Sequence, residues 1–157
     1  DLNRPGVAGL MYGRILVPLE NSPYDAAILT HVRSLARHCG ARLLLIHVAD
    51  GWAARNLDAL RLRESDEIRR DREYLDRVSA ELNDAGIVTE ALLASGEPAE
   101  EIARTADRER CDLIAMATHG HRIVADVFLG SVASAVRHRS LVPVLLVRGS
   151  ADGSSPS

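Results

Sequence analysis

The sequence predicts an α/β fold, a three-layer sandwich in which helices cover both faces of a parallel sheet. Apolar runs of strand length alternate with helical patterns five times, and residues 41–48 are largely apolar, as in strands that are covered on both faces. This alternation requires right-handed crossover connections, which place helices on both faces of the sheet. Where the strand order of such a sheet reverses, a crevice that binds ligands lies beyond the carboxyl ends of the strands.

The first strand is predicted at residues 14–18, where a proline ends the apolar run. In the helix that follows, Ser22 is expected to be the N-cap and Pro23 the first helical residue. Four apolar residues at spacings of four and three give this helix one buried face. Gly40 can end it in the left-handed conformation, and residues 41–48 then form the second strand.

A charged stretch at residues 57–85 is also predicted to be helical. Ile68, Leu75, Val78 and Leu82 form an apolar stripe along it, so the charges are interpreted as a solvated face. The later elements are a strand at 87–94, a helix from Gly96-Glu97-Pro98 with Glu100 and Glu101 in its first turn, a strand at 112–117, a helix at 132–139 and a last strand at 142–147.

The length and composition predict one domain. The chain has 157 residues, of which 46% are hydrophobic, enough for one substantial core. We expect the domain to occupy residues 11–148. Residues 1–10 are expected to be a tag or disordered extension, and residues 149–157, rich in Gly, Ser and Pro, a flexible tail.

Charge and cysteine content restrict the function classes. A net charge of -3 and a pI near 6.1 provide no field that would gather nucleic acid or acidic membranes. Cys39 and Cys111 lie far apart and lack metal-ligand spacing, so buried reduced thiols are expected, and with them a cytoplasmic location. No apolar stretch approaches the roughly 20 residues that span a bilayer, so membrane insertion is not expected.

The segment from Met116 to Ser131 indicates a binding site. An apolar run ends at a loop with Gly120, and Gly130 with Ser131 then opens a helix. Backbone amides at such a helix start favour a phosphate or similar anion. Three stretches lie at the carboxyl ends of predicted strands and are expected to meet in one crevice: residues 18–20, 47–48 and 117–121.

The chain resembles the universal stress protein family from Tyr12 to Arg148. The resemblance is carried, in order, by I-L-V-P-L-E-N-S-P, L-L-L-I-H-V, A-T-H-G, L-G-S-V-A and P-V-L-L-V-R. It implies a small stress-response regulator with a five-stranded parallel sheet ordered 3-2-1-4-5. It also implies a homodimer that pairs its last strands, here through Val144, Leu145, Leu146 and Val147.

Nucleotide-binding members of that family carry G-2x-G-9x-G-S/T. Here the second and third glycines match, but Ala117 replaces the first, and Glu20 stands where the family commonly has aspartate. By position, the resemblance implies an adenine nucleotide site for ATP, AMP or cyclic AMP, with or without Mg²⁺ and with no protein-bound metal. Its residues would be Pro18, Leu19, Glu20, Val48, Ala117, Thr118, Gly120, His121, Arg122, Gly130, Ser131 and Val132.

An alternative is a protein-interaction module of the same fold, with an unidentified protein partner and no nucleotide. Ala117, Glu20 and the bulky loop 121–123 favour this alternative. Arg122 can clamp a phosphate or pair with Asp126. His47 and His119 are more simply interpreted as bonded to backbone than as ligand contacts.

Enzymatic activity is not predicted. No histidine and acid accompany Ser22 in a nucleophile arrangement. The S-G-G-x-D-S and H-I-G-H signatures of related ATP-using enzymes are absent from L-E-N-S-P-Y-D-A. Slow ATP hydrolysis near Thr118, His119 and Ser131 stays an open alternative without an evident general base.

Overall fold

A computed structural model describes residues 11–50, 57–119, 131–150 and 152. Its five strands form one parallel sheet in the order β3-β2-β1-β4-β5, which confirms the predicted fold class and strand order. The strands are β1 (Arg14–Pro18), β2 (Arg42–Asp50), β3 (Thr89–Gly96), β4 (Leu113–His119) and β5 (Val144–Gly149).

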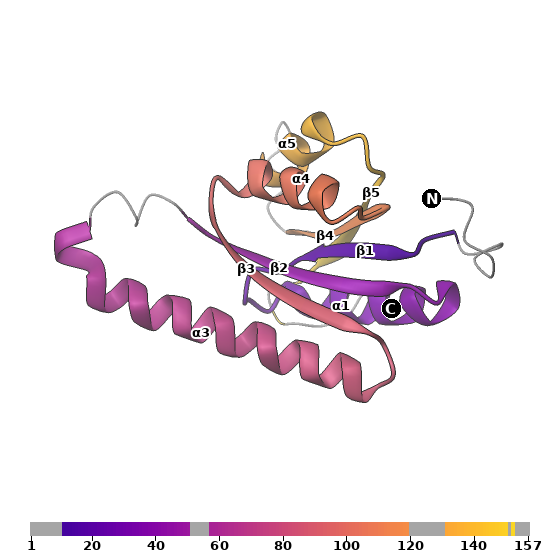
Figure 1. The fold of residues 1–157 in the computed structure, drawn as a ribbon, viewed down its shortest axis with the longest axis horizontal. Helices are drawn as coiled ribbons and strands as arrows, with labels where there is room; N and C mark the ends of the chain where they lie inside the picture. Colours follow the sequence, from indigo (N-terminus) through magenta and orange to yellow (C-terminus); the bar gives the residue numbers. More distant parts are fainter. Residues whose placement is uncertain (1–10, 51–56, 120–130, 151, 153–157) are drawn as a thin grey trace.

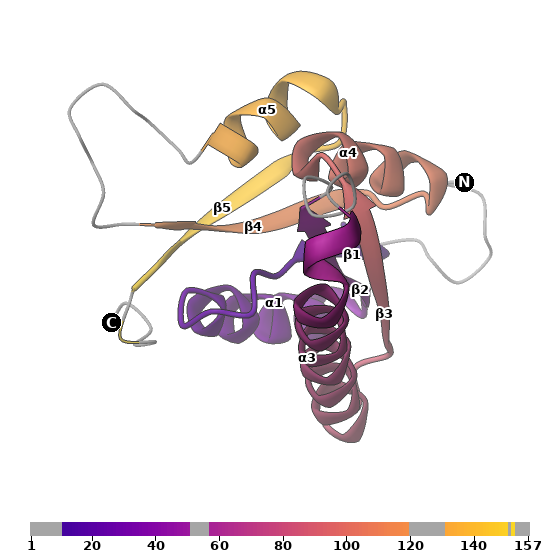
Figure 2. The ribbon, with the colours of Figure 1, turned by 90° about the vertical axis from the view of Figure 1, so that its left-hand side faces the viewer.

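The helices form the two outer layers. They are α1 (Asp25–Cys39), α3 (Leu57–Asp84), α4 (Pro98–Arg108) and α5 (Ser131–Arg139). Helices α1 and α3 cover one face of the sheet, and α4 and α5 cover the other (Figures 1 and 2). The three-layer arrangement predicted from the alternating pattern is therefore confirmed.

Neighbouring residues of the central strands point to opposite faces, so each face has its own core. Ile15 and Val17 of β1 pack with α1 and α3, whereas Leu16 between them packs with α4 and α5; all three are fully buried. Burying one such side chain contributes about 1.5–3 kcal/mol. This double burial explains why the central strands are apolar at nearly every position.

The start of α1 differs from the sequence prediction. The helix begins at Asp25, so Ser22 is not its N-cap and Pro23 is not its first residue. The carboxylate of Asp25 instead accepts the backbone N–H groups of Glu20, Asn21 and Ser22. An acidic side chain inside the first turn thus organises the loop before the helix.

The carboxyl-terminal end of α1 and the apolar stripe of α3 agree with the predictions. Gly40 closes α1 with φ of 65°. Leu75, Val78 and Leu82 of α3 are buried and Ile68 is half-buried, so the stripe faces the sheet and the charged side does not. The amino-terminal part of α3 extends past the edge of the sheet (Figure 1).

Four strands extend further at their carboxyl ends than predicted. The β2–β3 pairing continues to Asp50 and Gly96, and the β4–β5 pairing to His119 and Gly149. Backbone hydrogen bonds of a ladder do not need apolar side chains, so the strands run on after the apolar pattern stops. Gly149, expected at the start of the tail, is the last residue of β5.

Both cysteines are free and buried, as predicted. Burial raises the pKa of the Cys111 thiol to about 11. None of the helices in the described residues is both long and apolar enough to cross a bilayer.

Candidate functional site

A crevice opens between β1 and β4, where the strand order reverses. Backbone pairing between these strands is confined to Ile15 with Leu113 and Leu16 with Ile114, whereas β4 continues to His119. The carboxyl-terminal part of β4 therefore has β5 as its ladder partner and leaves its β1 side open. This is the position that the sequence analysis predicted for a ligand site.

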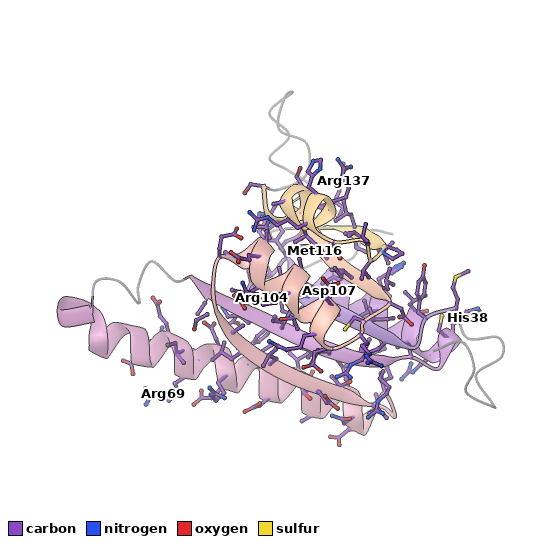
Figure 3. All side chains as sticks on the ribbon, turned by 45° about the horizontal axis from the view of Figure 1, so that its top comes forward. His38, Arg69, Arg104, Asp107, Met116 and Arg137 are labelled. Carbon is purple, nitrogen blue, oxygen red and sulfur yellow. The ribbon has the colours of Figure 1, made fainter. Side chains whose placement is uncertain are left out.

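A cavity of about 380 Å³ occupies the crevice. Its size lies within the range of small-molecule pockets, about 300–1,000 Å³. The floor is largely apolar; Met116, labelled in Figure 3, lies on the face of β4 that α4 and α5 cover. The lining residues are Pro18, Leu19, Glu20, Ile46, His47, Val48, Pro98, Ile102, Met116, Ala117, Thr118, His119, Ser131, Val132 and Ala133.

The structure brings together most of the residues predicted for the nucleotide site. Eight of them line the cavity: Pro18, Leu19, Glu20, Val48, Ala117, Thr118, Ser131 and Val132. The other four, Gly120, His121, Arg122 and Gly130, lie outside the described residues. The arginine–aspartate alternative for Arg122 lies outside them as well.

The loop that carries Glu20 is held from below by Asp25. This side chain is 2% exposed, and its oxygens lie 3.0 Å from the N of Glu20, 2.9 Å from the N of Asn21 and 3.4 Å from the N of Ser22. Asn21 adopts the left-handed conformation with φ of 60°, which asparagine tolerates better than most residues. One carboxylate thus fixes the backbone turn at the mouth of the cavity.

Tyr74 of α3 completes the hydrogen bonding of Asp25. Its hydroxyl donates to Asp25 Oδ2 at 2.6 Å. Burial first, and then the hydrogen bond to this carboxylate, raises the pKa of Tyr74 well above its ordinary value, so the hydroxyl keeps its proton. Helix α3 therefore supports the cavity from the opposite side of the sheet.

His47 on β2 is fixed at both ring nitrogens. Its Nδ1 lies 2.8 Å from the backbone oxygen of Leu19, and its Nε2 lies 3.1 Å from Asp71 Oδ2. The backbone contact agrees with our interpretation of this histidine as a structural residue. The same side chain also lines the cavity, so it ties the loop after β1 to the wall formed by β2.

His119 at the end of β4 pairs with Glu20 across the crevice. Its Nε2 lies 2.8 and 2.9 Å from the two carboxylate oxygens of Glu20, and its ring stacks on Tyr24 with centroids 3.8 Å apart. Within the described residues, the contacts of His119 are therefore with side chains, where we had expected a backbone partner. Ser22 donates its hydroxyl to the same carboxylate at 3.2 Å.

The beginnings of α4 and α5 close the remaining side. Glu97 is the N-cap of α4 and accepts the backbone N–H groups of Ala99 at 3.3 Å and Glu100 at 2.7 Å. The hydrogen bond from Glu100 N–H is the main cause that lowers the pKa of Glu97. Arg139, at the end of α5, donates to Glu97 at 2.8 Å and joins the two helices.

No group of three or more His, Cys, Asp or Glu side chains among the described residues could hold a metal ion. The ionisable side chains of the described lining are Glu20, His47 and His119, each engaged with a neighbour. This lining offers a ligand an apolar slot, hydroxyl groups, the Glu20 carboxylate and the start of α5.

Comparison with known proteins agrees with this geometry. Residues 11–148 match the model of the Universal stress protein family. The chain belongs to the universal stress protein family. A universal stress protein of Thermus aquaticus is 32% identical over 145 residues, which cover 88% of this chain and 100% of the relative. Another, of Methanocaldococcus jannaschii, is 27% identical over 156 residues, covering 88% and 96%.

Solved structures of universal stress proteins share the fold. The structure of the Methanocaldococcus jannaschii protein has a TM-score of 0.78 at 28% identity, covering 88% of this chain and 96% of that one. A universal stress protein in complex with cAMP has a TM-score of 0.66 at 22% identity, covering 88% and 98%. One from Archaeoglobus fulgidus in complex with dAMP has 0.65 at 23%, covering 87% and 98%.

Some supporting residues of this universal stress protein were missed by sequence reasoning. From the sequence, no role was assigned to Asp25, Asp71 or Tyr74. No spacing in the sequence joins α3 to the loop after β1, because they meet only through the fold. The local signal in the sequence was an aspartate two residues after Pro23.

Proposed function

We propose that this universal stress protein binds an adenine nucleotide, ATP, AMP or cyclic AMP, in the cavity between β1 and β4 and acts as a cytoplasmic stress-response regulator rather than as an enzyme. The observation that carries the proposal is the cavity itself, which eight of the twelve predicted nucleotide residues line. The cAMP and dAMP complexes of proteins with this fold support the choice of adenine nucleotides. The free buried cysteines are in keeping with a reducing compartment.

In this proposal the base lies in the apolar part of the cavity and the phosphates lie toward α5. Leu19 and Val48 offer apolar contact to the base, and the Glu20 carboxylate can accept from an amino or hydroxyl group. The amino-terminal end of α5 at Ser131 attracts an anion by about 0.3–1 kcal/mol. Gly120 and Gly130 would allow the backbone to approach the phosphates. Mg²⁺ would enter only with ATP.

Calorimetric titration of nucleotide-free protein tests the proposal. We expect saturable heat with at least one of ATP, AMP and cyclic AMP, measured with and without Mg²⁺. Val48→Arg, which places a long side chain in the cavity, should abolish the heat, whereas Val88→Arg, at a position 51% exposed, should not. Absence of heat at millimolar nucleotide would reject the proposal, and so would equal binding by both variants.

A second candidate function is a protein-interaction module that does not bind nucleotide. It is favoured by Glu20, whose two carboxylate oxygens are already engaged by His119, and by the methyl group of Ala117 in the cavity wall. Mass spectrometry of the purified protein, denatured to release bound compounds, separates the candidates. An adenine compound in stoichiometric amount would reject this second function.

We also propose a homodimer that pairs the last strands. Strand β5 is an edge of the sheet, and Val144, Leu145, Leu146 and Val147 are only half-buried in the single chain. Leu141, just before this strand, is fully exposed. Light scattering after size exclusion should give the mass of two chains. Leu141→Glu should weaken the dimer, and Met11→Glu, at another exposed position, should leave it intact.

A further inference from the structure

The pair of Glu20 and His119 lies exposed at the mouth of the cavity. Their side chains are 49% and 38% exposed. An exposed ion pair contributes little by itself, because solvent screens the charges and two side chains must be held in one geometry. A defined position for these two groups therefore needs support from a neighbouring residue.

Tyr24 provides a flat support for the histidine. The two rings are stacked, with their centroids 3.8 Å apart and their planes inclined by 16°. Tyr24 is the residue immediately before α1, and it is not itself part of the cavity lining. It touches His119 from a helix start that Asp25, the next residue, anchors in the core.

Gly149 lies close against the backbone of Tyr24. A Cβ atom at Gly149 would lie 2.6 Å from the backbone oxygen of Tyr24 and 3.1 Å from its Cα, closer than atoms can approach without moving. Gly149 is also the residue of β5 that pairs with His119 of β4. The end of β5 is thus in contact with both stacked residues.

We propose that Tyr24, seated against Gly149, is a positioning residue of this cavity: it holds the His119 ring on the Glu20 carboxylate so that this pair presents a preformed polar edge to the ligand. The ligand part of the proposal rests on the proposed function. The Glu20 carboxylate keeps acceptor capacity beyond its contacts with His119 and Ser22, so a ligand amino or hydroxyl group can bond to an already oriented group.

Nuclear magnetic resonance of the histidine rings tests the contact without any ligand. The chain has six histidines, and the His119 signals are assigned by their loss in His119→Gln. In Tyr24→Leu these signals should shift strongly, because the stacked ring is lost, while Tyr24→Phe should keep them near their wild-type positions. Unchanged His119 signals in Tyr24→Leu would overturn the proposal.

Gly149→Ala tests the second contact. The added methyl group should displace Tyr24 and shift the same His119 signals, although both rings remain. Gly13→Ala is the matched control, because a Cβ there makes an ordinary contact of 3.4 Å with Asp112. Equal His119 spectra in the two glycine variants would show that the contact with Gly149 does not position Tyr24, and would overturn the proposal as stated.

Titration with AMP and cyclic AMP tests the consequence for binding. The Kd of Tyr24→Leu should rise about fivefold, as expected when one oriented hydrogen bond is lost, and Tyr24→Phe should restore wild-type affinity. Equal Kd values for wild type and Tyr24→Leu would overturn the positioning role. If the wild type binds neither of these nucleotides nor ATP, the proposed function fails and the positioning role fails with it. That result differs from equal binding by wild type and Tyr24→Leu, which would overturn the positioning role alone.

Discussion

His47 Nε2 lies 3.1 Å from Asp71 Oδ2, which connects a histidine of the cavity wall to a helix on the opposite face of the sheet. The other nitrogen of the ring lies 2.8 Å from the backbone oxygen of Leu19. Asp71 also accepts a hydrogen bond from the side chain of Asn21. The Asp71 carboxylate therefore connects helix α3 to the loop after β1 in two ways. It contacts Asn21 of the loop directly, and it contacts His47, whose other ring nitrogen contacts the same loop at Leu19.

This arrangement predicts that Asp71 stabilises the fold more than a surface acid of the same helix. Asp71→Ala should lower the free energy of unfolding by about 1 kcal/mol relative to Asp66→Ala, because it removes the partly buried contact with His47 and the exposed hydrogen bond from Asn21. The control, Asp66, is 52% exposed and pairs with Arg69 within one turn of helix. Equal unfolding free energies by urea denaturation would contradict the prediction.

A larger effect is expected at Asp25. Asp25→Asn replaces one acceptor oxygen with a donor that faces backbone N–H groups or the Tyr74 hydroxyl. We expect a loss of about 2 kcal/mol in the free energy of unfolding. Tyr74→Phe, which removes a single donor, should cost about 1 kcal/mol. Denaturant midpoints of the two variants check the order, and a smaller loss for Asp25→Asn would reject this account of the loop.

The order of elements could be predicted because it depends on local patterns. The stripe of Leu75, Val78 and Leu82 and the closing glycine at residue 40 are readable within one helix length. The sheet order came with the resemblance to a known family rather than from spacing. The start of α1 could not be predicted, because Ser22 suits an N-cap by residue type, whereas in the structure it donates its hydroxyl to Glu20 and the helix begins at Asp25 without a side-chain cap.

The sequence predicted which segments line the candidate site, but not which of their side chains pair with one another. Residues such as Pro18 and Ala117 follow from strand ends, which the apolar pattern locates. The pairing of Glu20 with His119 joins residues 99 positions apart, and nothing local in the sequence specifies it. Pairs of this kind depend on how far apart β1 and β4 lie at their carboxyl ends, and no local sequence pattern specifies that distance.

Ala117 provides a direct test of the nucleotide proposal. Ala117→Gly restores the first glycine of the family motif and removes a methyl group from the cavity wall. Nucleotide affinity should increase about tenfold, as for removal of one obstructing methyl group, while stability falls by about 1 kcal/mol because glycine is unfavourable within a strand. Ala115→Gly, in the same strand and fully buried, should lose stability without gaining affinity.

Calorimetric titration measures the nucleotide affinity of these variants, and thermal unfolding measures their stability. Unchanged affinity in Ala117→Gly would show that the methyl group does not obstruct the ligand.

Glu97 gives the protein an acid-sensitive helix start. Hydrogen bonds from the backbone of Glu100 and Ala99, and the nearby Arg139, favour the charged carboxylate and lower its pKa from 4.5. A group whose pKa is lower in the folded state stabilises the fold above its unfolded pKa, and this contribution is lost as the pH falls through the folded pKa. The difference in unfolding free energy between wild type and Glu97→Gln should therefore be constant near pH 7 and decrease as the pH falls below 4.5. Denaturation curves for the two proteins from pH 7 to pH 3 measure this difference. Glu100→Gln is the control, because the Glu100 carboxylate accepts from Arg104 on the surface of the helix. The difference in unfolding free energy between wild type and Glu100→Gln should depend less on pH. A Glu97→Gln difference that grows on acidification would contradict the proposed role of the carboxylate.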